Sequence, residues 1–173
     1  MRRRSTSTVA RSRPVALVTY QDDAPAEDLV LATALRRRGL AVAHPRWSDP
    51  RVDWRAFRLA VVRSTWDYHL RRPEFLRWIS RTARSVELWN PPRTLRWNTD
   101  KRYLNDLAAA GVPVPPTIRL TGGRPVDVER IFRRFPGRSI VVKPEVSGGG
   151  FATSRFGPRQ RRAARAEIFR LLR

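Results

Sequence analysis

Short apolar runs alternate with amphipathic segments along the first half of the chain. Two segments, 26–38 and 74–84, place apolar side chains at helical spacing. Four runs are short enough to be buried strands because polar or turn-forming residues close them: 15–19, 40–43, 59–63 and 86–89. Strands that alternate with helices form βαβ units, whose connections make the strands parallel. The first half therefore predicts an α/β domain with a mostly parallel sheet.

The pattern changes after Pro91-Pro92, where the alternation of strands and helices becomes less regular. The expected elements there are a helix from Asn98 or Asp100 to Gly111, strands at 117–120, 139–143 and 151–156, and helices at 128–135 and 159–172. We accordingly divide the chain into a basic disordered tail at 1–13, a first domain at 14–96 and a second at 97–173.

The last predicted helix carries an apolar stripe formed by Ala164, Ile168 and Leu171. The chain ends directly after it, with no capping glycine and no later segment to cover the stripe. We therefore expect a truncated second domain whose exposed terminal helix promotes association.

Composition narrows the classes of function. The chain has no cysteine, which excludes disulfides, thiolate metal sites and cysteine nucleophiles, and its two histidines make a histidine metal cluster improbable. No signal-peptide core and no run of membrane-spanning length is found, so we expect a cytoplasmic protein with no membrane contact. The net charge of +21 predicts incidental binding to polyanions.

Among the 36 Lys and Arg residues only Lys101 and Lys143 are lysines. Lysine supplies a compact point charge that arginine does not copy, which makes these two positions candidates for specific chemistry. Lys101 opens a predicted helix, and Lys143 ends a predicted strand just before the loop Ser147, Gly148, Gly149, Gly150. Glycines let backbone N–H groups approach phosphate oxygens closely. Two lysines and such a loop favour a nucleotide triphosphate as the ligand. A solvated helix start and a flexible hairpin tip are the plain alternatives.

A second candidate site follows the third predicted strand. Arg63, Ser64 and Thr65 lie at its carboxyl end, where α/β sheets bind ligands. Arg63 can form a bidentate pair with a substrate carboxylate, while Ser64 and Thr65 donate hydrogen bonds. The alternative is that Arg63 packs on a structural cluster of Trp66, Tyr68 and Trp78.

Several segments in this order resemble the ATP-grasp ligases. They are Asn98–Leu104, Leu107–Pro115 and Val141–Pro144 before the glycine loop, and Val61–Tyr68 resembles the glutathione-synthetase-like or RimK-like subgroup, which includes a cycloserine-forming cyclo-ligase. The resemblance implies a Rossmann-like pre-ATP-grasp domain followed by the first, incomplete ATP-grasp subdomain. It also implies that Lys101, Lys143 and the glycine loop bind ATP.

The intact family chemistry is an ADP-forming ligation. The resemblance implies that ATP phosphorylates a small carboxylate substrate to an acylphosphate, which an amine then attacks, so the protein needs no nucleophile of its own. The family binds Mg²⁺ through an acidic residue and a Glu-x-Asn motif, and no Glu-x-Asn occurs in this sequence. We therefore expect the Mg²⁺ ligands outside this chain, no catalytic or metal-ligating residue within it, and no ligase turnover by the chain alone.

Two alternatives from other classes remain open. One is a basic α/β protein that binds nucleic acid, in which Lys101 and Lys143 have no special role. The other is a non-catalytic ATP-grasp remnant that acts as an interaction module and shows no dependence on ATP.

Overall fold

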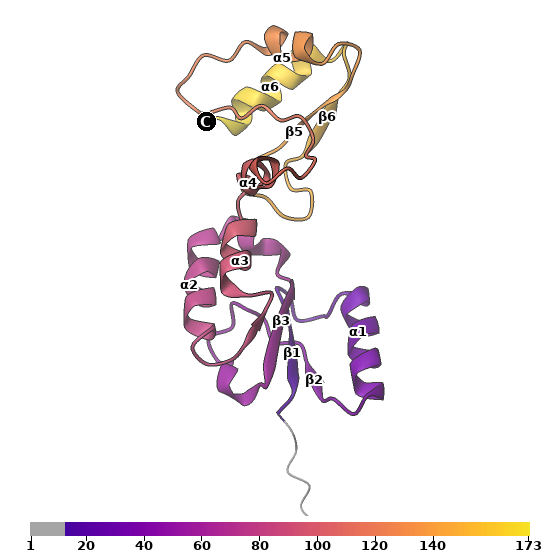
Figure 1. The fold of residues 1–173 in the computed structure, drawn as a ribbon, viewed down its shortest axis with the longest axis vertical. Coiled ribbons are helices and arrows are strands. Elements are labelled where there is room, and N and C mark those ends of the chain that lie inside the picture. Colours follow the sequence, from indigo (N-terminus) through magenta and orange to yellow (C-terminus); the bar gives the residue numbers. More distant parts are fainter. Residues whose placement is uncertain (1–12) are drawn as a thin grey trace, which may run out of the picture. The chain divides into compact units, whose positions relative to one another are not determined.

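The computed structural model describes residues 13–173, and the chain divides into two compact units, the first ending at Arg96 and the second beginning at Trp97 (Figure 1). The tail predicted for 1–13 lies, except for Arg13, outside the described residues. Each unit has its own buried apolar side chains and is described below by itself.

The first unit is built on a parallel sheet with the strand order β2-β1-β3-β4. Every pair of neighbouring strands in it is parallel, which confirms the predicted α/β class. The strands are β1 (Val15–Thr19), β2 (Val42–Ala43), β3 (Leu59–Ser64) and β4 (Leu88–Trp89). All five residues of β1 are buried, as expected of a central strand whose two faces are both covered.

Helices cover both faces of this sheet. They are α1 (Ala26–Arg37), the short 3₁₀ helices η1 (Trp54–Ala56) and η2 (Trp66–Leu70), α2 (Arg72–Thr82) and α3 (Pro92–Asn98). In Figure 1, α1 lies on one side of the strands and α2 on the other. The β-strand period of two explains this arrangement. Val15 and Leu17 of β1 pack with Ala32 of α1, whereas Ala16 and Val18 belong to the larger cluster on the opposite face.

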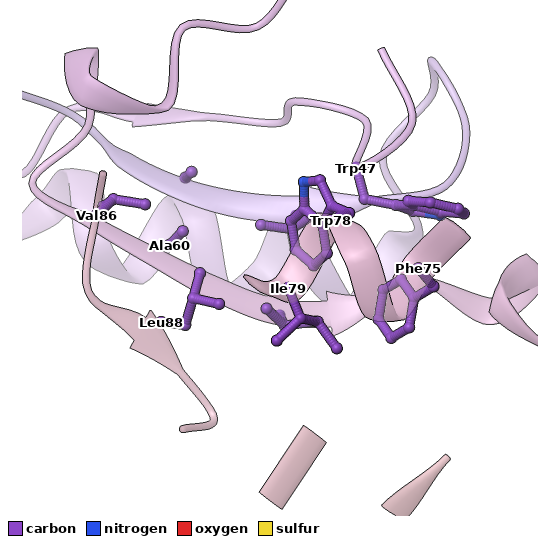
Figure 2. Close-up of a cluster of buried hydrophobic side chains, with 10 residues drawn as sticks. Trp47, Ala60, Phe75, Trp78, Ile79, Val86 and Leu88 are labelled. Carbon is purple, nitrogen blue, oxygen red and sulfur yellow. The ribbon is translucent and has the colours of Figure 1, made fainter. Parts of the chain in front are cut away.

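Aromatic side chains form the centre of that larger cluster. Trp47 meets the rings of Phe75 and Trp78 edge-on, with ring centroids 5.2 and 6.2 Å apart. Figure 2 labels these three side chains together with Ile79 of α2, which belongs to the same cluster and lies beside Trp78. Trp66, which one alternative assigned to a structural cluster, is 45% exposed, and the buried tryptophans of this cluster are Trp47 and Trp78.

The second unit pairs a small hairpin with helices. The two strands β5 (Ile140–Val142) and β6 (Ser154–Phe156) are antiparallel. The helices are α4 (Tyr103–Ala109), α5 (Val128–Arg134) and α6 (Arg161–Leu171). Asp127 caps α5 by accepting a hydrogen bond from the backbone N–H of Arg130 at 2.9 Å.

The structure corrects two expectations for the region after residue 90 and adds helix α3, which was not predicted. Pro92 starts that helix, since proline is well suited to the first helical position. The helix expected from Asn98 or Asp100 to Gly111 is only α4, preceded by turns. The segment 117–120 forms no strand, because the only sheet described in this unit consists of β5 and β6.

The apolar stripe of the last helix is not exposed. Ala164 and Ile168 of α6 are buried against Val128 and Phe132 of α5, and the hairpin residues Ile140, Val142 and Phe156 pack against the same cluster. The expectation of an uncovered stripe was wrong, because α5 and the hairpin precede α6 in the chain and fold back onto it. The stripe is therefore part of the core of the second unit, which removes its basis as an association surface.

Candidate functional site

Lys101 is held at the base of the glycine loop. Its Nζ donates hydrogen bonds to the carbonyl oxygen of Ser147 at 2.9 Å and to Ser147 Oγ at 2.7 Å. Its backbone N–H donates to the carbonyl of Glu145 at 2.9 Å. Ser147 is buried, so its side chain anchors the loop to Lys101.

The two lysines affect each other electrostatically. Partial burial and, after it, the positive charge of Lys143 lower the pKa of Lys101. Lys143 follows directly after β5 and is exposed. Within residues 13–173 it has no ion-pair or hydrogen-bond partner. Two cations that repel each other are thus held near the same loop, and an anion bound between them would relieve this repulsion.

The glycine loop presents unpaired backbone donors. The N–H groups of Gly148, Gly149 and Gly150 donate to no acceptor in the described part of the chain. Gly149 and Gly150 have φ angles of 55° and 75°, a left-handed conformation that favours glycine. The N–H of Phe151 closes a turn onto the carbonyl of Gly148 at 2.9 Å. Lysine charges beside free amide donors are a suitable donor set for phosphate, and the residues present therefore fit the phosphates of ATP.

A network of ion pairs flanks Lys101, and the sequence analysis did not identify it. Arg102 pairs with the buried Asp100 at 2.6 Å, and Arg119 pairs with Glu145 at 2.9 Å. Arg102 also approaches Glu145 at 3.8 Å. These contacts connect the segment around Lys101 to the segment that enters the loop. The adjacent opposite charges of Asp100 and Arg102 on either side of Lys101 were the sequence signal for them.

In the first unit, Arg63 lies near the carboxyl end of β3, as predicted. Its Nε donates to Oδ1 of Asp28 on α1 at 2.7 Å, and the Arg63 side chain remains 40% exposed while that of Asp28 is fully buried. The arginine that packs on the aromatic cluster is Arg71, whose guanidinium lies 4.6 Å from the centroid of the Trp47 ring. Arg63 therefore pairs with a buried acid that the sequence analysis did not single out.

Ser64 and Thr65 are both buried, with 1% and 7% of their surface exposed. Because side chains alternate along a strand, Ser64 lies on the opposite face of β3 from Arg63. The structure thus does not bring the Ser64 hydroxyl together with the Arg63 guanidinium.

His44 follows β2 at the same end of the sheet. Both of its ring nitrogens are buried and have no hydrogen-bond partner in residues 13–173. Burial, followed by the charge of Arg36, lowers the pKa of His44, while the charge of Asp28 raises it. The balance favours a neutral imidazole.

In residues 13–173, no three His, Cys, Asp or Glu residues are grouped so that they could hold a metal ion. None of the described helices combines the length and the apolar character that crossing a membrane requires.

Comparison with known proteins finds several to which this chain is similar. Residues 15–90 match the family model of the N-terminal domain of the D-cycloserine synthetase DcsG. The structure also resembles the crystal structure of D-cycloserine synthetase DcsG, with a TM-score of 0.77 and 35% identity over 91% of this chain and 55% of that one. This chain is similar to the amino-terminal portion of D-cycloserine synthetase.

Two further relatives support the relationship. The cycloserine biosynthesis protein DcsG of Streptomyces lavendulae is 40% identical over 117 residues, which are 66% of this chain and 39% of that protein. A RimK domain ATP-grasp protein from Sphaerobacter thermophilus has a TM-score of 0.62 at 22% identity, covering 92% of this chain and 60% of that one, and this likeness supports the fold alone. The chain thus spans less than two thirds of the length of each relative.

Proposed function

We propose that this chain is the part of an ADP-forming ATP-grasp ligase that binds the phosphates of ATP and a small carboxylate substrate. The observation that supports it best is the pair Lys101 and Lys143, two mutually repelling cations beside a loop with unpaired amide donors. The likeness to D-cycloserine synthetase makes formation of D-cycloserine by the whole protein the first reaction to assay.

Each unit has a separate part in this proposal. In the second unit, Lys101, Lys143 and the amides of Gly148, Gly149 and Gly150 would hold the phosphate groups, and Ser147 would anchor the loop through Lys101. Bound ATP would supply the phosphoryl group that activates a carboxylate. In the first unit, Arg63 would bind that carboxylate, while their burial restricts Ser64 and Thr65 to structural roles.

Magnesium enters the proposal only through the family. Mg²⁺ would neutralise the phosphate charge, and its ligands are expected outside this chain. Lys143 is exposed, so its attraction to phosphate is screened by solvent and salt. We therefore propose that the 173-residue chain binds ATP weakly and has no ligase turnover alone.

The proposal is tested by titrating the purified chain with ATP and following backbone amide resonances by NMR, which detects weak binding. We expect saturable shifts at Gly148–Gly150, and a large loss of affinity in Lys143→Ala. Arg134→Ala is the matched control, because Arg134 is an exposed cation of the same unit without a described partner. This substitution also removes one positive charge, but from a position that is not next to the glycine loop in the sequence.

The outcomes separate the proposal from its alternatives. If Arg134→Ala weakens binding as much as Lys143→Ala, the chain binds ATP only as a polyanion, which supports the basic nucleic-acid-binding alternative. Absence of any shift at the loop, both in the chain and in a longer protein that contains it, would support the interaction-module alternative. Release of ADP by the 173-residue chain alone would contradict the expected inactivity.

A further inference from the structure

The ion pair between Asp28 and Arg63 contains a single hydrogen bond. Asp28 accepts a hydrogen bond from Arg63 Nε through Oδ1 only, and its buried Oδ2 has no partner in residues 13–173. Neither Nη nitrogen of Arg63 donates a hydrogen bond to another residue in that range. An arginine and a carboxylate can form two parallel hydrogen bonds, but this pair forms one.

Stability alone does not account for such a pair. Burying a carboxylate removes it from water, and the attraction to one partner offsets that loss only when the other lone pairs are also satisfied. Here Asp28 is fully buried while Oδ2 remains unsatisfied. The arrangement nevertheless has one geometric effect, because it fixes the guanidinium by its Nε side and leaves the two Nη nitrogens available.

The backbone places this group where a ligand can meet it. Asp28 lies in the first turn of α1, and Arg63 precedes the last residue of β3. Leu59 and Val61 of β3 pack on the α1 side of the sheet, and the period of two puts Arg63 on that same side. Since 40% of the Arg63 side chain is exposed, a ligand can reach it at the carboxyl edge of the sheet.

We infer that Asp28 is a positioning residue that orients the Nη edge of Arg63 for a planar, two-oxygen anion. This inference rests on the carboxylate-binding role proposed above for Arg63. Asp28 lowers the attraction of Arg63 for every anion, because its own charge is negative. Its contribution is therefore selectivity: a fixed pair of parallel donors matches a carboxylate and gives no such advantage to a spherical anion.

The test compares two anions of equal charge. The chain is titrated separately with acetate and with chloride at constant ionic strength, and binding is followed by the NMR signals of the Arg63 Nε–H group and of the backbone N–H of residue 63, which every variant keeps. The measured quantity is the ratio of the two affinities. Removing the charge of Asp28 changes both affinities in the same direction, so the ratio reports on the geometry of the donors.

We expect Asp28→Asn to lower the acetate-to-chloride ratio by about three- to ten-fold, the effect of a long side chain that must be ordered on binding. Glu27→Gln is the matched control, because it removes the same charge from the neighbouring position of the first turn of α1, and it should leave the ratio unchanged. Arg63→Lys, which keeps the charge but loses the planar fork, should lower the ratio at least as far.

Each outcome is decisive. An unchanged ratio in Asp28→Asn, with amide spectra that show a folded chain, overturns the inference even if the variant is less stable. If Asp28→Asn does not fold, Arg63→Lys decides, because an unchanged ratio in that variant removes the role of the fork. If acetate does not shift the Arg63 signal of the unmodified chain, the inference fails together with the carboxylate role of Arg63. The ATP titration at Lys143 is unaffected by that failure and tests the nucleotide part separately.

Discussion

Replacing Ile168 by alanine tests whether α6 belongs to the core of the second unit. The side chain of Ile168 is 2% exposed, and alanine removes three of its carbon atoms. At about 0.8 kcal/mol for each buried carbon, the lost transfer free energy is about 2.4 kcal/mol. The cavity that remains adds to this cost, and measured losses for such substitutions are about 2–5 kcal/mol. We expect the free energy of unfolding of the second unit to fall by about 3 kcal/mol.

The effect should be confined to one unit. The buried cluster of the second unit consists of Val128, Phe132, Ala164 and Ile168, so Ile168→Ala removes a large part of it. Hydrogen exchange followed by mass spectrometry should show faster exchange in α5, α6 and the β5–β6 hairpin. The strands β1 and β3, which pack in separate clusters, should keep their protection.

Phe169→Ala is the control for this experiment. Phe169 is the next residue of α6 and is 38% exposed, and its ring lies 5.5 Å from the guanidinium of Arg165. Loss of that exposed contact should cost about 0.5–1 kcal/mol. If Ile168→Ala leaves stability unchanged and instead reduces self-association in sedimentation, the stripe faces another molecule and our account of the second core is wrong.

Three smaller predictions concern single side chains. Because the pKa of His44 is lowered in the folded chain, the unfolded chain takes up the proton first as the pH falls below about 6.5, and the free energy of unfolding should fall there. His44→Gln should reduce this dependence of the free energy of unfolding on pH, measured by urea unfolding, with His69→Gln measured in parallel. Asp127→Ala removes the cap of α5 and should cost about 1 kcal/mol in thermal unfolding, whereas Asp127→Asn should retain most of it. Gly150→Ala should destabilise the loop by about 1 kcal/mol because φ is 75° there, and Gly150→Asn should cost less, as the melting temperatures of the two variants would show.

The parallel sheet could be predicted from local patterns because proline, polar or turn-forming residues mark where its strands begin and end. The range of β1 was predicted correctly, since Pro14 precedes the apolar run and polar residues follow it. The face of α1 was predicted less well. Apolar spacing groups Leu29 with Ala32 on one face of this helix, but Leu29 is 49% exposed, whereas Asp28 is fully buried. Burial of a charged residue can be predicted only when its ion-pair partner is known. The partner of Asp28 is Arg63, which lies 35 residues away in the sequence.

The second unit shows a different limit. The segment 117–120 has strand-like residues, but a strand also needs a neighbour to pair with, and propensity does not supply one. The loop side of the site was easier to predict, because Lys101, Lys143 and the glycines are rare or conformationally distinctive residues. The hydrogen bonds of Lys101 to Ser147 were not predictable, since they depend on how two distant segments pack.

The sheet of the first unit also has a consequence for how the chain behaves at high concentration. Its outer strands, β2 and β4, are only two residues long, while the apolar strand β1 lies between them. A sheet edge recruits another molecule through its unpaired backbone groups, and such short edges offer few of them. A buried five-residue strand that is apolar except for Thr19 is thereby kept from templating cross-chain pairing. Any lengthening of β2 or β4 would therefore raise the tendency of the folded chain to form intermolecular β-structure.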